Sequence, residues 1–149
     1  MSAQDPRNKF KTDNYEKQEQ EVPGIQAKMS PQPDCGDDSY HGHHRLDGFK
    51  ILVTGGDSAI GRAAAIAYAK EGADVAINYL PSEQQDADDV KQIIENVGQK
   101  AILIPGDIRD EQFNYDMVEK AYQQLGGLDN VTLVAGHQLY QDELSEFKT

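Results

Sequence analysis

The sequence has few of the features that suit secretion, a membrane or nucleic acid. A single cysteine, Cys35, cannot form an intrachain disulfide, which is typical of a reducing compartment. Only 14 residues are Lys or Arg against 26 Asp or Glu, and the resulting formal charge of −12 repels nucleic-acid phosphates and anionic lipids. The longest nearly apolar run, residues 63–69, is too short to span a bilayer, and no signal-peptide pattern opens the chain. We therefore expect a soluble, cytoplasmic protein with neither a nucleic-acid nor a membrane partner.

The composition divides the chain near residue 48. Residues 1–48 show no apolar period of 2 or 3.6, which predicts an irregular, extended N-terminal arm. This arm carries 6 basic and 9 acidic residues, whereas residues 49–149 carry 8 and 17, so the acidic excess belongs mainly to the second part. We expect an arm over residues 1–48 and one folded domain over residues 49–149.

Short apolar runs alternate with long amphipathic stretches after the arm. This pattern predicts strands at residues 51–53, 74–79, 100–105 and 130–135, with a small-residue helix after the first strand and helices at residues 82–97 and 110–125. Strands that alternate with helices are typical of parallel βαβ units with right-handed crossovers. The fold class is therefore expected to be α/β.

Helical spacing predicts the buried face of the two later helices. Asp86 is expected to lie outside the stripe of the first of them. The apolar stripes consist of Val90, Ile93, Ile94 and Val97 in the first, and of Phe113, Met117, Val118, Ala121 and Leu125 in the second.

The segment between the first strand and the first helix reads T-G-G-D-S-A-I-G over residues 54–61. A dinucleotide site needs glycine for a tight turn, for close approach to the pyrophosphate and for helix packing, with the phosphates at the helix N-terminus. Gly55 and Gly61 suit the turn and the packing, although a glycine-rich turn can also close such a connection without a ligand. Its place after the first strand favours a nucleotide site, as does Tyr79, which follows Gly61 by 18 residues, near the expected spacing of about 20.

This turn resembles the T-G-x-x-x-G-x-G turn of the short-chain dehydrogenase/reductase family. Two later segments fall in the family's order: Pro105-Gly106-Asp107-Ile108 resembles the segment whose aspartate hydrogen-bonds near the adenine, and Leu133-Val134-Ala135-Gly136 resembles N-N-A-G. Arm residues 23–29 and 33–36, followed by Arg45-Leu46, resemble the extension of a bacterial subgroup. The resemblance implies a Rossmann-like parallel sheet in the order 3-2-1-4, corresponding to the N-terminal half of the family's domain.

By this resemblance, the reaction is hydride transfer between NADP or NAD and an alcohol or carbonyl compound, and the complete enzyme is a homo-oligomer. No residue of the chain corresponds to the family's catalytic Ser or Tyr-x-x-x-Lys, and no metal is implied. A six-stranded sheet needs roughly 150–180 residues, whereas 101 follow the arm, so we expect a truncated domain. The alternative is a non-catalytic product that serves as a weak nucleotide-binding or interaction module. The cofactor-binding positions implied are Gly55, Asp57, Ser58, Ile60, Gly61, Tyr79, Asp107, Ile108, Ala135 and Gly136.

The chain departs from the family pattern at several positions. Ala59 stands in place of the middle glycine, and its methyl group is expected to crowd the phosphate or ribose. Leu133 and Val134 replace two asparagines, so the roles of those side chains do not carry over. Tyr79 stands where an acidic residue would select NAD, which slightly favours NADP although Asp57 supplies some repulsion and no Arg follows.

The histidines do not form a recognisable site. His41, His43 and His44 lie near Cys35 in the arm, but they lack the C-x-x-C or H-x-x-x-H spacing of metal ligands. His137 follows Gly136, where it either contacts the nicotinamide or lies in an exposed loop.

Overall fold

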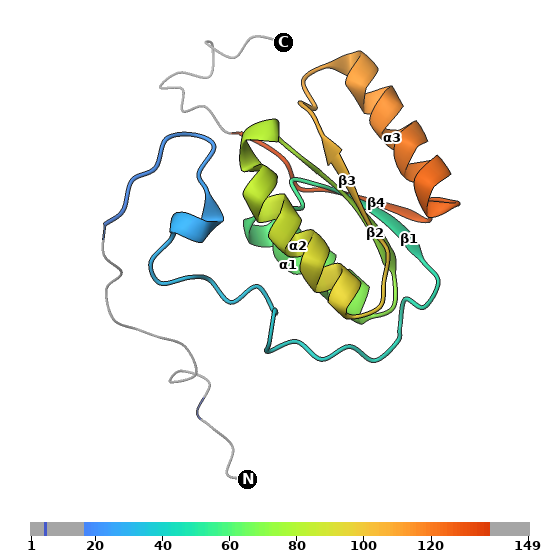
Figure 1. Ribbon diagram of the computed structural model, residues 1–149, viewed down its shortest axis with the longest axis horizontal. Helices are drawn as coiled ribbons and strands as arrows, with labels where there is room; N and C mark the ends of the chain where they lie inside the picture. The colour runs from blue at the N-terminus through green and yellow to red at the C-terminus, as the bar shows by residue number, and fades with distance from the viewer. Residues whose placement is uncertain (1–4, 6–16, 138–149) are drawn as a thin grey trace.

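The computed structural model describes Asp5 and residues 17–137 (Figure 1). In these residues a parallel sheet has the order β3-β2-β1-β4. The predicted α/β class and the 3-2-1-4 order are therefore confirmed. The strands are β1 (Lys50–Thr54), β2 (Asp74–Tyr79), β3 (Ala101–Pro105) and β4 (Asn130–Leu133).

Helices cover both faces of the sheet. Helices α1 (Ala59–Lys70) and α2 (Gln84–Asn96) lie on one face, and α3 (Glu111–Leu125) lies on the other (Figure 1). A short 3-10 turn, η3 (Pro81–Glu83), joins β2 to α2. Helix α3 begins after its N-cap residue Asp110, whose carboxylate accepts the N–H of Phe113, the first residue of the apolar stripe, at 3.1 Å.

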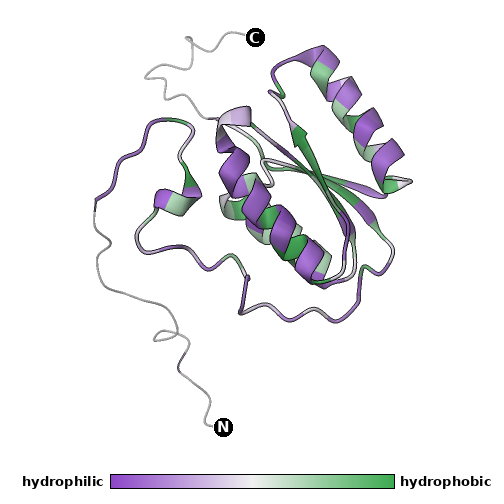
Figure 2. Ribbon diagram, viewed as in Figure 1, coloured by the Kyte–Doolittle hydropathy of each residue, from purple (hydrophilic) through white to green (hydrophobic). Residues whose placement is uncertain are grey.

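Two apolar layers hold these helices on the sheet. Side chains alternate along β1, so that Ile51 and Val53 face α1 and α2 while Leu52 faces α3. Ile66 and Val90 complete the first layer. Figure 2 shows largely hydrophobic strands in the centre of the sheet and helices in which hydrophilic and hydrophobic residues alternate. The two apolar layers hold β1 and β2 in place, and with them the positions at which the β1–α1 turn and η3 begin.

The predicted helix faces need three corrections. Val97 is exposed because α2 ends at Asn96, so that Val97 lies past the last helical residue. Val118 is also exposed, since it lies about 100° around the helix from the buried Met117. Asp86 was expected outside the stripe, yet it is buried, because its carboxylate accepts the backbone N–H groups of Gln26 at 2.7 Å and Ala27 at 3.3 Å. Hydrogen bonds of this kind are what a buried carboxylate requires.

The arm is irregular over residues 17–48, apart from a 3-10 turn η2 (Gln26–Lys28), but it is fastened to the domain. At the end of α1, the buried Glu71 accepts hydrogen bonds from Arg45 Nη2 at 2.5 Å and from the Tyr40 hydroxyl. Nearer the start of α1, Arg62 donates to Asp37 at 2.9 Å. The arm therefore lies along the length of α1.

Neither a metal-ligand cluster nor a membrane-spanning helix is present in the described residues. Over Asp5 and residues 17–137, no three His, Cys, Asp or Glu side chains come together as metal ligands. In the same part of the chain, no helix is long and apolar enough to cross a membrane.

The Glu71 cluster predicts a pH-dependent contribution to stability. Hydrogen bonds from Arg45 and Tyr40 hold the pKa of Glu71 well below its ordinary value of 4.5. A lowered folded-state pKa stabilises the fold above about pH 4.5, and this contribution is lost as the pH falls toward the lowered value. We expect Glu71→Gln to lower the thermal unfolding midpoint at pH 7 and the difference to shrink below pH 4.5.

Thermal melts between pH 3 and 7, with Glu95→Gln as a control for an exposed carboxylate, test this expectation. An equal loss at every pH would contradict the assigned role of the Glu71 charge.

Candidate nucleotide-binding site

The turn between β1 and α1 favours glycine at three positions. At two of them a side chain would clash, and at the third the backbone has a positive φ. A Cβ atom on Gly61 would lie 1.8 Å from the carbonyl oxygen of Gly55. A Cβ atom on Gly56 would lie 2.6 Å from Ile77 Cγ2. Gly55 itself has φ +62°, in the left-handed region that favours glycine. The predicted turn and packing roles of Gly55 and Gly61 thus correspond to observed close approaches.

Ala59 also has a left-handed backbone, with φ +45°. This conformation costs a residue with a Cβ atom about 1–2 kcal/mol, and a glycine would adopt it without that cost. The side chain of Ala59 is exposed, so the strain lies in the backbone and not in packing.

The first turn of α1 offers hydrogen-bond donors to an anion. Ser58 is the N-cap residue, with an extended backbone and no side-chain cap hydrogen bond. The first N–H groups of a helix have no acceptor within the helix, and they lie at its positive end. Ile60 is 75% exposed, so this turn is open to solvent. A phosphate or pyrophosphate group fits such a site.

The end of β4 lies directly against this turn. The hydroxyl oxygen of Thr54 accepts the N–H groups of Val134 at 3.1 Å and Ala135 at 3.2 Å. A Cβ atom on Gly55 would lie 3.2 Å from Ala135 Cα. The structure therefore brings together the predicted residues of the turn and Ala135, with Gly136 following in the exposed segment. Thr54 is the first residue of the predicted turn motif, but it was not among the predicted site residues.

The end of β2 is organised by Asn78, which the sequence analysis also missed. Its side-chain amide donates to the carbonyl oxygens of Ile104 at 3.1 Å and Gly106 at 3.0 Å, and its backbone oxygen accepts the N–H of Gly56 at 3.1 Å. Asn78 thus links the glycine turn to the loop after β3. A buried amide within an otherwise apolar strand was the available indication.

The neighbouring Tyr79 is buried, and its hydroxyl donates to Gln84 Oε1 at 2.7 Å. Burial raises the pKa of Tyr79. The phenol is therefore neutral at ordinary pH and is engaged by the first residue of α2.

Asp107 lies half-buried in the loop after β3, with Ile108 packed beside it at the edge of the α3 layer. Its carboxylate accepts hydrogen bonds from Arg109 Nε at 2.9 Å and Nη2 at 2.5 Å, which lowers the pKa of Asp107 to about 2. Asp107 is thus ionised at neutral pH, and an adenine amino group would share its oxygens with Arg109.

The other acidic residues near the turn point inward. Asp57 is 1% exposed, and one of its oxygens, Oδ2, has no partner among the described residues. Burial raises the pKa of Asp57, and burial together with the Asp57 charge raises the pKa of Glu83. These carboxyl groups are therefore buried beside the turn and are not exposed on its surface.

His137 is exposed in the segment that follows Gly136. Tyr140, three residues further along the chain, lies outside the described residues.

A family profile and two curated relatives match this chain over most of its length. The profile of the short chain dehydrogenase family matches residues 50–148. The chain is 58% identical to "Uncharacterized oxidoreductase YghA" of Escherichia coli over 95% of its length, and 56% identical to "Uncharacterized oxidoreductase YhxD" of Bacillus subtilis over 97%. These alignments cover 48% of each relative, so the chain spans about half the length of the curated relatives it matches.

Solved structures agree with the sequence comparison. A short chain dehydrogenase from Burkholderia cenocepacia, crystallised in complex with NADP, is 39% identical with a TM-score of 0.60. A short-chain type dehydrogenase/reductase from Mycobacterium marinum is 30% identical with a TM-score of 0.61. Each alignment covers 70% of this chain, with 42% of the first neighbour and 41% of the second.

The left-handed backbone at Ala59 predicts a stabilising substitution. Ala59→Gly removes the Cβ strain and keeps the turn, although glycine adds entropy to the unfolded chain, so we expect a net gain of about 0.5–1 kcal/mol in unfolding free energy. Loss of the methyl group should also tighten NADPH binding. Urea denaturation and titration calorimetry measure the two effects.

The matched control is Ala63→Gly, within α1, which should lose about 1 kcal/mol. A loss of stability in both variants would show that strain at Ala59 has been misjudged.

Proposed function

Because the chain belongs to the short-chain dehydrogenase family, we propose that it forms the cofactor-binding part of an oxidoreductase that transfers hydride between NADP and an alcohol or carbonyl compound. The observation that carries this proposal is the turn at Gly55 and Gly61. There the backbone of residue 61 lies so close to that of residue 55 that no side chain fits, and the N-terminus of α1 next to it has no side-chain cap. Such a turn allows the backbone to approach a pyrophosphate closely. A dinucleotide is the ligand that this geometry favours.

The residues present fit a nicotinamide dinucleotide along the ends of the strands. We assign the pyrophosphate to the first turn of α1, at Ser58, Ile60 and Gly61. The adenine is assigned to the loop with Asp107 and Ile108, which Asn78 holds near the glycine turn. The nicotinamide side is assigned to Ala135 and Gly136, which lie beside Gly55.

NADP is the preferred form of the cofactor. The residue at the end of β2 is Tyr79, so no carboxylate there repels a 2′-phosphate. The two nearby acids, Asp57 and Glu83, are buried, and burial raises the pKa of each. The NADP complex of the Burkholderia cenocepacia neighbour supports the same choice at the level of the family.

In the proposed enzyme, this chain binds the cofactor, and another part supplies the group that exchanges the proton. When bound, the dinucleotide supplies or accepts the hydride. The residues described above bind and orient it, but the 149 residues contain no Tyr-x-x-x-Lys sequence to exchange the accompanying proton. In the proposed enzyme, therefore, the acid/base residue comes from a part that corresponds to the second half of the longer relatives.

A second candidate is a non-catalytic nucleotide-binding or interaction module. The exposed edge of the sheet favours this reading, because Leu133 on β4 is 79% exposed and Val131 is exposed beside it. Apolar residues on an uncovered edge strand promote association with another chain. The two candidates share the nucleotide site and differ in turnover.

The first test of the proposed function is binding. We expect titration calorimetry to show tighter binding of NADPH than of NADH, and Gly61→Asp to abolish binding of both, because a side chain at residue 61 meets the Gly55 carbonyl and adds a negative charge where phosphate would lie.

Gly98→Asp is the matched control, since a Cβ atom on Gly98 meets nothing within 4 Å and Asp adopts positive φ more readily than most residues. Circular dichroism confirms that each variant is folded. Undiminished binding by Gly61→Asp would place the nucleotide elsewhere.

The second test separates the two candidates. We expect the 149-residue chain to produce no change in nicotinamide absorbance with a panel of alcohols and aldehydes, because a positioned acid/base group contributes about 10²–10⁴-fold to such a reaction. Addition of the second half of the Escherichia coli relative should restore turnover if this chain is a cofactor-binding part. A signal from the chain alone that Gly61→Asp abolishes would show that its own residues suffice for catalysis.

A further inference from the structure

The arm contacts the glycine turn through Gln26. We propose that Gln26 is a positioning residue for the dinucleotide: by holding the Ala59 peptide in its left-handed conformation, it aims the next N–H groups of α1 at the pyrophosphate. This inference rests on the proposed function. It assigns to the N-terminal arm a role in the nucleotide site, with Gln26 acting through Ala59 and not by touching the nucleotide.

Gln26 and Cys35 hold Ala59 from both sides of the residue. The Gln26 side chain is buried at 6% exposure, and its Oε1 accepts the N–H of Ala59 at 2.6 Å. Its Nε2 donates to Cys35 Sγ at 3.5 Å. The Cys35 thiol in turn faces the carbonyl oxygen of Ala59 at 4.0 Å. Two arm side chains therefore contact the polar atoms of the residue whose backbone is strained.

The carboxylate of Asp86 fixes Gln26 in place. Asp86, in the first turn of α2, accepts the backbone N–H groups of Gln26 at 2.7 Å and Ala27 at 3.3 Å. Two hydrogen bonds from consecutive backbone N–H groups to one buried side chain leave η2 little freedom to move. The contact therefore spans three elements: η2 of the arm, the start of α1 and the start of α2.

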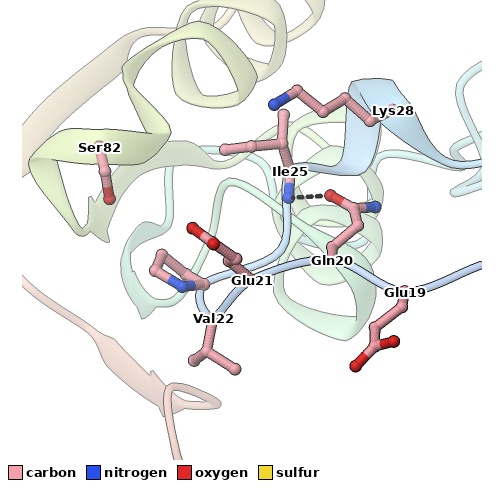
Figure 3. Close-up of a pocket in the computed structure, with 8 residues that line it drawn as sticks. Glu19, Gln20, Glu21, Val22, Ile25, Lys28 and Ser82 are labelled. Carbon is pink, nitrogen blue, oxygen red and sulfur yellow. Dashed lines mark hydrogen bonds between the residues drawn. The ribbon is translucent and has the colours of Figure 1, made fainter.

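The arm segment before η2 is folded by its own hydrogen bonds and borders a hollow next to η3. The Gln20 side chain accepts the N–H of Ile25 at 2.8 Å, and a hollow of about 420 Å³ lies between this segment and Ser82 of η3 (Figure 3). The loop that carries Gln26 is thus shaped by its own hydrogen bonds on one side and by Asp86 on the other.

The hydrogen bond between Gln26 and Ala59 decides which backbone N–H groups of the turn are available to a ligand. Because Gln26 accepts the N–H of Ala59, that group is already paired, and the next donors, Ile60 and Gly61, remain for an anion. Without Gln26, the Ala59 N–H loses its acceptor and the residue is free to relax toward negative φ, where alanine is unstrained. A change of φ at this position redirects the peptides that follow.

The test compares Gln26→Met, which keeps the length and volume of the side chain but removes the acceptor, with the same change in an Ala59→Gly background. We expect Gln26→Met to weaken NADPH binding about tenfold, the equivalent of one hydrogen bond. With glycine at residue 59, positive φ carries no Cβ strain, so the loss should fall below about twofold. Gln32→Met is the matched control, because Gln32 bonds the Ala27 carbonyl and does not contact the turn.

Amide hydrogen exchange provides a readout that needs no nucleotide. Exchange of the Ala59 N–H should quicken in Gln26→Met and stay unchanged in Gln32→Met. If the unsubstituted chain fails to bind NADPH, the proposed function is wrong and the positioning role is overturned with it. If it binds NADPH and Gln26→Met binds equally well, or if glycine at residue 59 does not rescue the loss, the inference alone is overturned.

Discussion

Residue 61 has no room for a side chain, because the first turn of α1 lies against the backbone that ends β1. This close approach determines the position of α1 on the sheet and the place where the N-terminus of α1 is exposed to solvent. Thr54 then binds the end of β4, and Asn78 binds the loop after β3. Hydrogen bonds from the strand ends therefore bring three segments together at one helix N-terminus: the glycine turn, the loop after β3 and the segment after β4. The fold and the candidate site share the same constraint.

The electrostatics of this region differ from those of the chain as a whole. The chain carries a formal charge of −12, which would oppose a dinucleotide if the charges were spread evenly. Around the turn, however, Asp57, Glu83 and Asp86 are buried, and Asp107 is paired with Arg109. The acidic residues nearest the proposed phosphates are therefore buried or hydrogen-bonded. The N-terminus of α1 is the positive end of the helix dipole and opens to solvent beside them.

The parts of the structure that the sequence predicted depend on local order. Strand and helix alternation, the glycine turn and the family resemblance all rest on neighbouring residues, and the order of the sheet is confirmed. Gln26 and Asp86 could not be paired in this way, because 60 residues separate them and neither belongs to a periodic pattern. Asp86 was expected in solvent because helical spacing describes only one partner surface, whereas α2 has a second one in the arm. Asn78 and Thr54 were missed for a related reason: their hydrogen bonds join loops that become neighbours only after the sheet forms.

The pairing of β1 with β4 also has a consequence for synthesis. Ile51 lies opposite Asn130, so the central strand acquires its second neighbour only after most of the described chain has been made. Before that point, β1, β2 and β3 can already pair, with α1 and α2 packed on one face. The nascent chain therefore completes the loop after β3, the proposed adenine side, before the segment after β4, the proposed nicotinamide side. A dinucleotide that binds this partly made domain would favour its folded form by mass action while the ribosome is still adding residues.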